Sequence, residues 1–466
     1  MLNWVNLLNG ERERISESQS TPYRNEFDKD YDRIIYSSSF RRLQDKAQVF
    51  PLQDNDFTRT RLTHSLEVAS LGRSLAWNIG NWLIETKQYH DFSDAKKLAS
   101  LVEVSCLVHD LGNPPFGHYG EDIIRSWFAE WFSSKAYEEA CRKYGDLNEQ
   151  QKYDFLYFEG NAQAIRILSK LQFLNDQYGA NFTYGTLATL MKYPWESNHK
   201  KVKEGKKKFG YFYSENELFE TIKEKVGIIE CRHPATYILE AADDMAYLTA
   251  DIEDAVKKHV ITWDKVYEEL RKEFADSYPT EFNRLEQLRE KALSNKVSNK
   301  DLIDVQNFKV AVQGIMINAV VDTFKSNYEI IMKGEFQGDL LSHSTASALS
   351  DKLEKVASTH VFSNKEVLTL ELVGDKVLTD LLDLFVSAVV NVGDIAKTKS
   401  KNEKLVHLIS ENFRHIQKIS ESGEPTVEFK SLPLYNRLLL VTDFISGMTD
   451  GYAVNLHREL LGVKLP

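Results

Sequence analysis

The chain has 466 residues, of which 42% are hydrophobic and 11% aromatic. This composition excludes a disordered protein and allows a large packed core. Its 58 Lys and Arg against 69 Asp and Glu give a formal net charge of -11. A chain-wide positive field that would attract nucleic acid is therefore absent, and any anion site must be a local cluster.

The cysteines and the N-terminal sequence indicate a reducing compartment. Cys106, Cys141 and Cys231 are scattered and odd in number, which argues against a disulfide framework and against a structural zinc site. The N-terminal sequence becomes charged before an apolar stretch reaches signal-peptide length, and no apolar run is long enough to cross a bilayer. We predict a cytoplasmic protein that has no membrane partner.

Apolar residues recur at helical spacing along most of the chain, which predicts an all-α fold with little or no sheet. The only short segment with strand character is 209–213. The amphipathic stretches lie, in chain order, near 62–76, 98–106, 160–172, 234–256, 302–333, 364–390 and 432–464.

One loop is distinct in composition. Residues 194–210 carry six lysines between positions 200 and 208. The simplest interpretation is a solvated, mobile loop; the alternative is that one or two lysines reach a phosphate-bearing ligand. The sequence has neither a P-loop nor a dinucleotide fingerprint, so phosphates would not be held by a glycine-rich loop.

The segment SCLVHDLGNPPFGHYGE at 105–121 places two ligand-type residues at the end of an apolar helix. His109 and Asp110 come just before Gly112 and Pro114, which stop the helix. Polar side chains at a buried helix end need partners, because burying them alone costs free energy. A single His-Asp pair is weak evidence, since an exposed helix end can carry one by chance.

Two other helices carry residues that could complete a site. His64 stands near the start of one, and Asp243 and Asp244 form an acidic pair within an apolar one. Each has an ordinary explanation: a capped or core histidine, and carboxylates that face solvent. With 3.6 residues per turn, Asp243, Tyr247 and Asp251 share one face. That face is half apolar and half acidic, which suits the lining of a site.

Two histidines and two carboxylates provide mixed nitrogen and oxygen ligands for a metal. Such a set suits Mn, Fe, Ni, Co or Zn better than Ca, and leaves positions open for water and substrate oxygens. A metal of this kind neutralises phosphate charge and activates water. We therefore predict a metal-dependent phosphohydrolase whose ligands are His64, His109, Asp110 and one carboxylate of the pair Asp243 and Asp244.

A second polar pair follows directly. His118 and Glu121 are three residues apart, about one turn of a helix. Glu121 could orient and charge the imidazole, which would make His118 a general acid for a departing oxygen. An ordinary helix N-terminus explains Glu121 but not His118, so we favour catalysis.

Long stretches of the sequence carry a family resemblance. They are RRLQDKAQVFPL at 41–52, RTRLTHSLEV at 59–68, CLVHDLGNPPFGHYGE at 106–121, FEGNAQAIR at 158–166, EAADDMAYLTADIEDAV at 240–256 and DFISGMTDGYA at 443–453. They resemble the HD-domain phosphohydrolases, and more closely the bacterial deoxyguanosine triphosphate triphosphohydrolases (dGTPases). The resemblance covers nearly the whole chain. It implies an HD-type catalytic core over residues 1–260 and a helical C-terminal region, 261–466, that completes the nucleotide pocket.

The resemblance also implies a reaction: hydrolysis of dGTP to deoxyguanosine and inorganic tripolyphosphate. Water activated at Mn, Mg or another ion such as Fe, Ni or Co would attack the α-phosphorus, and His118 would protonate the departing 5′ oxygen. Asp243 rather than Asp244 would be the fourth ligand. Relatives are often hexamers or tetramers, so a homo-oligomer is expected.

The same resemblance implies the substrate contacts. Gln48 and Val49 match positions beside the sugar and base, Tyr247 and Asp251 match the 3′ side of the deoxyribose, and Glu371 matches a position near guanine. An aromatic ring where a 2′-hydroxyl would sit gives a steric reason to prefer deoxyribose. The residues that match phosphate-side or nearby positions are Arg61, Asn161, Lys192 and Lys208.

Two departures from the family pattern leave the choice of base open. Tyr157 replaces a histidine, and residues 397–404 carry lysines where relatives have an arginine. One alternative is a broad-specificity dNTP triphosphohydrolase, or an HD phosphohydrolase acting on another nucleotide such as a guanosine alarmone. An alternative of another class is a single-stranded-DNA-binding or regulatory module with a vestigial site, to which residues 199–208 would contribute. The complete ligand set and the negative charge argue against it.

Overall fold

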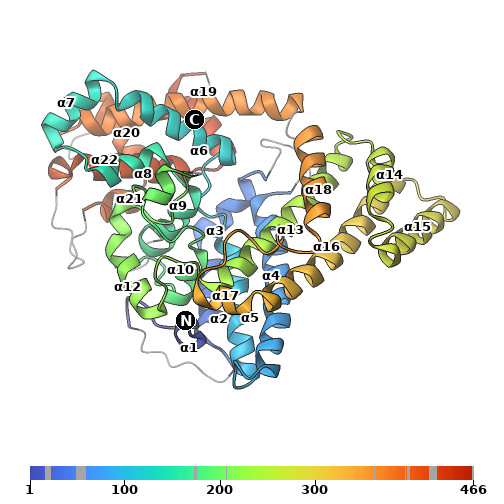
Figure 1. Cartoon of the computed structure of the whole chain (residues 1–466). Coiled ribbons are helices and arrows are strands. Elements are labelled where there is room, and N and C mark those ends of the chain that lie inside the picture. Colours follow the sequence, from blue (N-terminus) through green and yellow to red (C-terminus); the bar gives the residue numbers. More distant parts are fainter. Residues whose placement is uncertain are drawn as a thin grey trace.

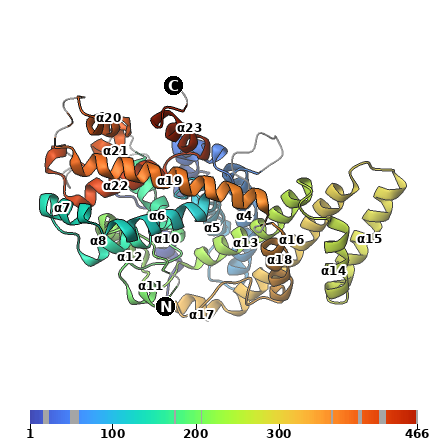
Figure 2. The same cartoon turned by 90° about the horizontal axis from the view of Figure 1, so that it is seen from above.

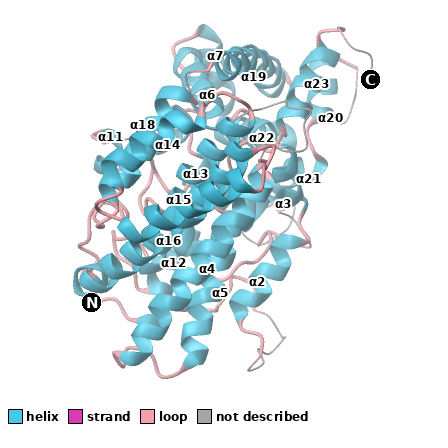
Figure 3. Ribbon diagram, turned by 90° about the vertical axis from the view of Figure 1, so that its right-hand side faces the viewer, coloured by secondary structure: helices cyan, strands magenta, loops and turns pink. Residues whose placement is uncertain are grey.

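The computed structural model describes residues 1–15, 23–48, 59–172, 176–205, 207–361, 364–393, 395, 399–418 and 428–463. Helices and loops make up the fold in this part of the chain (Figure 3), and β pairing there is limited to three isolated bridges. The prediction of an all-α fold is confirmed. The expected strand at 209–213 is wrong: a single bridge joins Tyr211 to Glu196, and a 3₁₀ turn begins at Tyr213.

Four long helices form the centre of the molecule (Figure 1). They are α4 (Arg61–Glu85), α5 (Phe92–Val108), α13 (Pro234–Lys257) and α16 (Lys300–Ser326). The pair α4 and α5 makes the most extensive helix contact, and α13 packs on both as well as on α16. Their apolar faces merge into one large core. The predicted ligand residues lie on three of these helices or directly after them.

A second apolar core joins segments that are far apart in the sequence. It lies among α6 (Gly117–Trp131), α8 (Glu149–Leu156), α19 (Lys365–Asn391) and α22 (Leu434–Ser446). Figure 2 shows α19 running across α6, and these two helices are in contact. Arg437 is fully buried there and donates to backbone carbonyls near the ends of the neighbouring elements, including those of Leu432 and Phe429. The C-terminal helices thus cover the segment that carries His118.

The remaining helices complete the body, except that α14 and α15 project from one side (Figures 1 and 2). Their bounds are α1 (Trp4–Leu7), α2 (Glu26–Ile35), α3 (Ser38–Arg42), α7 (Lys135–Tyr144), α9 (Gly160–Arg166), α10 (Tyr184–Leu190), α11 (Lys200–Lys203), α12 (Asn216–Val226), α14 (Trp263–Phe274), α15 (Pro279–Ser294), α17 (Tyr328–Lys333), α18 (Ser347–His360), α20 (Lys401–Leu408), α21 (Glu411–Ile416) and α23 (Asp450–Leu460). Four one-turn elements, η1 (Leu43–Asp45), η2 (Ile167–Leu171), η3 (Tyr213–Glu215) and η4 (Phe429–Ser431), link them.

Helix boundaries differ from the sequence expectation in two places. The stretch predicted at 302–333 is interrupted at Asn327, where α16 ends and α17 begins. The stretch at 432–464 divides at Gly447 into α22 and α23. The division of the chain into regions at residue 260 stays a prediction. Within the described ranges, no helix has the length and apolar character that a bilayer span requires.

Candidate active site

Three ligand-type side chains meet where α4, α5 and α13 pack together. His64 lies in the first turn of α4, His109 directly follows α5, and Asp243 lies in the middle of α13. Asp243 Oδ1 is 3.1 Å from His64 Nε2 and 3.3 Å from His109 Nε2. One donor atom of each residue lies within 4.8 Å of the others, an arrangement that could hold a metal ion. Both histidines are buried.

The state of His109 fits a metal ligand. Its Nδ1 lies 2.6 Å from the carbonyl oxygen of Cys106, so Nδ1–H donates to the backbone and Nε2 is the nitrogen that faces Asp243. Nε2 is buried and has no hydrogen-bond partner, and a buried polar nitrogen without a partner costs free energy. Two imidazoles and a carboxylate suit a divalent transition metal. The donor set therefore fits a divalent cation.

Asp110, the other predicted ligand, lies beside this group and is held by other partners. Its Oδ2 accepts from Arg61 Nη1 at 2.8 Å and its Oδ1 from Asn113 Nδ2 at 2.5 Å. Oδ1 is 3.6 Å from His109 Nε2. Burial would raise the pKa of Asp110, but the charges of Arg61 and His109 hold it well below its usual range. Asp110 is thus ionised next to the three residues, and its role as a ligand stays a prediction.

A cation already neutralises the central carboxylate. Lys192 Nζ lies 3.1 Å from Asp243 Oδ2. Burial would raise the pKa of Asp243, and the charges of His109 and Lys192 keep it well below its usual range instead. Burial opposes the charge on His109, but Asp110 and Asp243 raise its pKa to about 9. The two carboxylates of the group are therefore ionised, and each already has a cationic side chain as a partner.

The predicted catalytic pair lies at the start of α6. The chain enters this helix through Phe116 in the left-handed region, with φ 64°. His118 Nδ1 then lies 3.3 Å from Glu121 Oε2. The His118 side chain is 76% exposed, whereas that of Glu121 is 1% exposed. The exposed ring can present its other nitrogen to a ligand while the buried carboxylate fixes its orientation.

Charges around the pair set its protonation. The hydrogen bond to Glu121 and the charge of this carboxylate raise the pKa of His118, against the opposing charges of Arg61 and Lys208. Burial would raise the pKa of Glu121, but the hydrogen bond from His118 and the charge of Lys208 lower it to about 2. Glu121 also accepts from Arg125 Nη2 at 3.1 Å. The pair is thus an ionised carboxylate bound to an imidazole that favours its protonated form.

Two glycines allow the catalytic segments to approach each other. A Cβ on Gly112 would lie 2.0 Å from the carbonyl oxygen of Gly160, and a Cβ on Gly160 would lie 2.6 Å from Asn113 Oδ1 and 2.8 Å from Glu121 Oε1. Any side chain at either position would therefore collide with its neighbours. The end of α5 consequently meets the first residue of α9, whose N–H donates to Glu121 Oε1 at 2.8 Å.

Arg61 connects the metal group with the catalytic pair. Its guanidinium contacts Asp110, and a Cβ on Gly117 would lie 2.5 Å from its Nη2. It therefore packs against the residue that precedes His118. Arg61 is itself buried, and its Nε has no hydrogen-bond partner. A buried guanidinium between the two groups suits an anionic ligand that would bridge them.

Known proteins share these residues' sequence context. The model of the HD domain matches residues 61–167. A deoxyguanosinetriphosphate triphosphohydrolase-like protein of Listeria innocua is 39% identical over 479 residues, which cover 99% of this chain and all of the relative. This chain belongs to the deoxyguanosinetriphosphate triphosphohydrolase-like family. A further family member, from Pseudomonas aeruginosa, is 34% identical over both full lengths. A deoxyguanosinetriphosphate triphosphohydrolase of Salmonella paratyphi A is 31% identical over 94% of each chain.

The phosphate-side residues expected from the family fall into two groups in the structure. Arg61 and Lys192 contact the carboxylates of the metal group. Lys208 and Asn161 lie at the catalytic pair, where both contact Glu159: Lys208 Nζ at 2.8 Å and Asn161 Nδ2 at 2.6 Å. All four predicted residues thus adjoin one or other half of the site.

Among the described residues, those expected beside the sugar and base show burial and charge but no hydrogen bond or ion pair with the metal group or the catalytic pair. Asp251 is buried, and its Oδ2 has no hydrogen-bond partner; burial and the charge of Asp254 raise its pKa. Tyr247 is half-buried one turn after Asp243. Gln48 Oε1 is buried without a partner. Glu371 is half-buried on α19, and burial raises its pKa. Val49 lies outside the described residues.

The lysine-rich segment makes specific contacts that its composition did not indicate. It contains the short helix α11, and three lysines lie over aromatic rings: Lys201 over Trp195, Lys203 over Tyr153 and Lys207 over Tyr157. The contacts of Lys203 and Lys207 hold the segment against α8 and the residue that follows it, whereas Lys201 packs on a ring within the segment. Tyr157, which departs from the family pattern, thus supports the residue before Lys208. All three lysines are nevertheless exposed, in line with the expectation of a solvated segment.

Sequence reasoning missed three residues at the site: Asn113, Arg125 and Glu159. Asn113 belongs to the quoted HDLGN text, and Arg125 stands one helical turn after Glu121, so spacing could have indicated both. Glu159 belongs to the FEGN text, where an acidic residue before a helix is ordinarily read as a cap.

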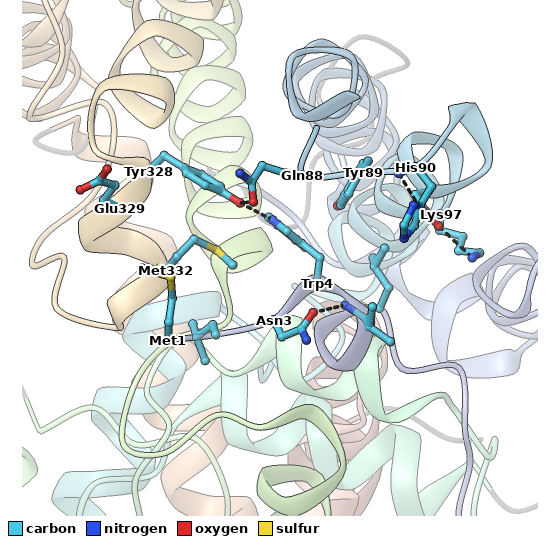
Figure 4. A pocket seen from close by; sticks show the side chains of 14 residues that line it. Met1, Asn3, Trp4, Gln88, Tyr89, His90, Lys97, Tyr328, Glu329 and Met332 are labelled. Carbon is cyan, nitrogen blue, oxygen red and sulfur yellow. Dashed lines mark hydrogen bonds and ion pairs between the residues drawn. The ribbon is translucent and has the colours of Figure 1, made fainter. Parts of the chain in front are cut away.

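One hollow on the surface is separate from this site. It lies between the N-terminal segment, the turn after α4 and α17, and none of the predicted site residues line it (Figure 4). Trp4 Nε1 donates there to Tyr328 Oη at 2.9 Å, and Trp4 packs edge-on against Tyr89. These contacts dock the N-terminal segment on the body.

Proposed function

We propose that this protein hydrolyses dGTP to deoxyguanosine and inorganic tripolyphosphate. The observation that carries the proposal is the meeting of His64, His109 and Asp243 from three helices, with Arg61 between them and the His118–Glu121 pair. The names of the relatives, which describe hydrolases of deoxyguanosine triphosphate, support the choice of substrate.

The cofactor in this proposal is a divalent cation, Mn, Mg or another metal such as Fe, Ni or Co. His64, His109 and Asp243 would hold it, and Asp110 is the candidate for the fourth ligand. Such an ion supplies Lewis acidity, which neutralises phosphate charge and makes water a better nucleophile at neutral pH. The unpaired Nε2 of His109 and the concentration of carboxylates support this assignment.

His118 is the proposed general acid, because its ring is exposed and its Nδ1 is held by Glu121. Water attacks the α-phosphorus, and the bond between that phosphorus and the 5′ oxygen breaks. The second nitrogen of the His118 ring gives its proton to the departing oxygen, which becomes the 5′-hydroxyl of deoxyguanosine. Glu121 stabilises the charged imidazole before the transfer and fixes its orientation throughout.

The cationic side chains around the site are the proposed phosphate ligands. Arg61 and Lys192 would leave their carboxylate partners in part to bind the triphosphate on the metal side, and Lys208 and Asn161 would bind it beside His118. Tyr247 and Asp251 would contact the 3′ side of the sugar, with the Tyr247 ring excluding a 2′-hydroxyl. Gln48, Val49 and Glu371 would contact the sugar and base.

A substrate panel tests the proposal. Purified protein with Mn or Mg is given the four dNTPs, GTP and a guanosine alarmone, separately and in competition. The proposal expects dGTP to give deoxyguanosine and tripolyphosphate fastest. Comparable rates for all dNTPs would replace it with a broad-specificity triphosphohydrolase. No hydrolysis, together with salt-dependent binding of single-stranded DNA, would replace it with the regulatory alternative.

The assembly state belongs to the same proposal. We expect a homo-oligomer, a hexamer or a tetramer, in line with the family resemblance. Light scattering on the purified protein gives the mass of the assembly directly. A monomeric mass would contradict this part of the proposal without affecting the chemistry.

A further inference from the structure

Glu159 is a buried carboxylate without a role in the proposed reaction. Its exposure is 0%, and it stands at the residue before α9. The ordinary explanation is a helix cap, but its side chain accepts no capping hydrogen bond from α9. A fully buried carboxylate that does not serve its own helix must be stabilised by other groups.

The partners of Glu159 all belong to the catalytic half of the site. Oε2 lies 2.8 Å from Lys208 Nζ and 3.5 Å from Arg125 Nη2, and Oε1 accepts from Asn161 Nδ2 at 2.6 Å. Lys208 and Asn161 are proposed phosphate ligands. Arg125 also binds Glu121 Oε2 at 3.1 Å. One carboxylate therefore holds both phosphate-side residues and shares a guanidinium with the partner of His118.

Lys208 lies closer to Glu159, whereas Arg125 lies closer to Glu121. Lys208 Nζ lies 2.8 Å from Glu159 Oε2 but 3.7 Å from Glu121 Oε2. Arg125 is closer to Glu121, at 3.1 Å, than to Glu159, at 3.5 Å. Because Glu159 engages Lys208, the Oε2 atom of Glu121 stays available to His118. Without the charge of Glu159, both cations would turn to Glu121 and compete with the imidazole for the same oxygen.

We propose that Glu159 is a positioning residue, which holds Lys208 and Asn161 toward the substrate phosphates and keeps Glu121 available to His118. This inference rests on the proposed function for the meaning of the phosphate contacts. Its effect on His118 is independent of any substrate. When the nucleotide binds, the ammonium group of Lys208 moves from Glu159 to a phosphate oxygen. When the product leaves, Lys208 returns to Glu159.

The charged groups around each member of the cluster determine the expected titration. His118 faces Glu121 on its own helix, Arg61 from α4 and Lys208 from the lysine segment. Glu159 faces Glu121 and Arg125 from α6 and Lys208, and its charge also acts on Tyr193. Replacing Glu159 by Gln removes one negative charge and leaves Glu121 with two competing cations. Protonated His118 is then less stabilised, so the pKa of His118 should fall by about 1.

Histidine hydrogen–deuterium exchange followed by mass spectrometry measures the pKa of His118 in the full-length protein without nucleotide. The variants are Glu159→Gln and, as a matched control, Glu149→Gln, which removes an exposed carboxylate paired with Lys203 at 2.8 Å. We expect a lower His118 pKa in the first variant and the wild-type value in the second. A wild-type His118 pKa in folded Glu159→Gln would overturn the inference.

A second variant keeps the test decisive if Glu159→Gln does not fold. Glu159→Asp keeps the charge but draws it back by one methylene, so Lys208 and Asn161 lose their alignment. We expect a KM for dGTP raised about 10-fold, because charge-assisted contacts to the phosphates are weakened, with a His118 pKa near that of the wild type. An unchanged KM would overturn the inference. If the wild type releases no tripolyphosphate, the proposed function fails, while the His118 titration still tests the role of Glu159.

Discussion

Lys192 Nζ lies 3.1 Å from Asp243 Oδ2, on the carboxylate whose other oxygen contacts His64 and His109. Burial opposes the charge on Lys192, but the charges of Asp243 and Glu240 raise its pKa well above its usual range. Lys192 is therefore a fixed positive charge at the candidate metal group. Arg232 stabilises the backbone at this residue, because its Nε donates to the Lys192 carbonyl oxygen at 3.0 Å.

A fixed cation at this place should weaken metal binding and strengthen phosphate binding. We expect Lys192→Met to raise the KM for dGTP about 10-fold or more, because a charge-assisted contact to phosphate is lost. The metal should bind at least as tightly as in the wild type, because a repulsive charge is removed. Steady-state kinetics and metal titration measure the two effects. Lys200→Met removes an exposed lysine of the same region and should change neither; weaker metal binding in Lys192→Met would contradict the assignment.

Loss of His109 should abolish metal binding. Its Nε2 is a buried nitrogen without a hydrogen-bond partner that faces the group, so His109→Ala should lower metal affinity by at least about 100-fold and activity in parallel. Elemental analysis after dialysis and activity assays with added Mn check the result. His90→Ala, an exposed histidine outside the site, serves as the control. Full metal content in His109→Ala would contradict the proposed ligand set.

The rate should decline at alkaline pH as His118 loses its proton. Only protonated His118 can give a proton to the 5′ oxygen, and the hydrogen bond to Glu121 raises the pKa of His118 above its ordinary value near 6.5. The alkaline limb of kcat should therefore lie above this pH in the wild type. In Glu121→Gln the stabilising charge is gone, so the limb should move to lower pH. His118→Ala should lose the limb and about 100- to 10,000-fold in kcat; an unchanged pH profile in Glu121→Gln would contradict the pairing.

Sequence periodicity predicted much of the fold, because helical spacing of apolar residues is a local property. His109 was singled out because it is polar at the end of an apolar helix, and His64 because it could complete a site with it from the start of another helix; their role as ligands stays a prediction. The interruption at Asn327 was missed, since the apolar pattern continues across it from α16 into α17.

The partners of the site residues were not predictable from spacing. Asp110 contacts Arg61, which is 49 residues away, and Lys192 contacts Asp243, which is 51 residues away. Such contacts depend on how α4, α5 and α13 pack, which no single segment encodes. Glu159 was not identified for a related reason: only the tertiary structure reveals that its carboxylate binds Lys208 and does not cap the backbone of its own helix.

A buried ion network behind the site should dominate the stability of the segment that begins with Glu159. Arg166 on α9 binds Asp443 through Nε and Nη2, each at 2.8 Å, and Glu215 through Nη1 at 2.8 Å. All three side chains are almost fully buried. Arg166→Met would leave two carboxylates without their cation, so the free energy of unfolding should fall by about 3–5 kcal/mol. Chemical denaturation measures it.

A matched substitution at an exposed arginine serves as the control for Arg166→Met. Arg271 is half-exposed and forms longer contacts with Glu268 and Glu286, at 3.5 and 3.4 Å. Arg271→Met should lower the free energy of unfolding by no more than about 1 kcal/mol. Equal losses in the two variants would show that burial does not strengthen the dependence on Arg166.

The position of the cleaved bond is the central claim of the proposed chemistry. Hydrolysis of dGTP in H₂¹⁸O, with products identified by ³¹P NMR and mass spectrometry, tests it most directly. Attack of water on the α-phosphorus with loss of the 5′ oxygen predicts ¹⁸O in tripolyphosphate and unlabelled deoxyguanosine. Release of pyrophosphate with dGMP, or ¹⁸O in the deoxyguanosine, would contradict it.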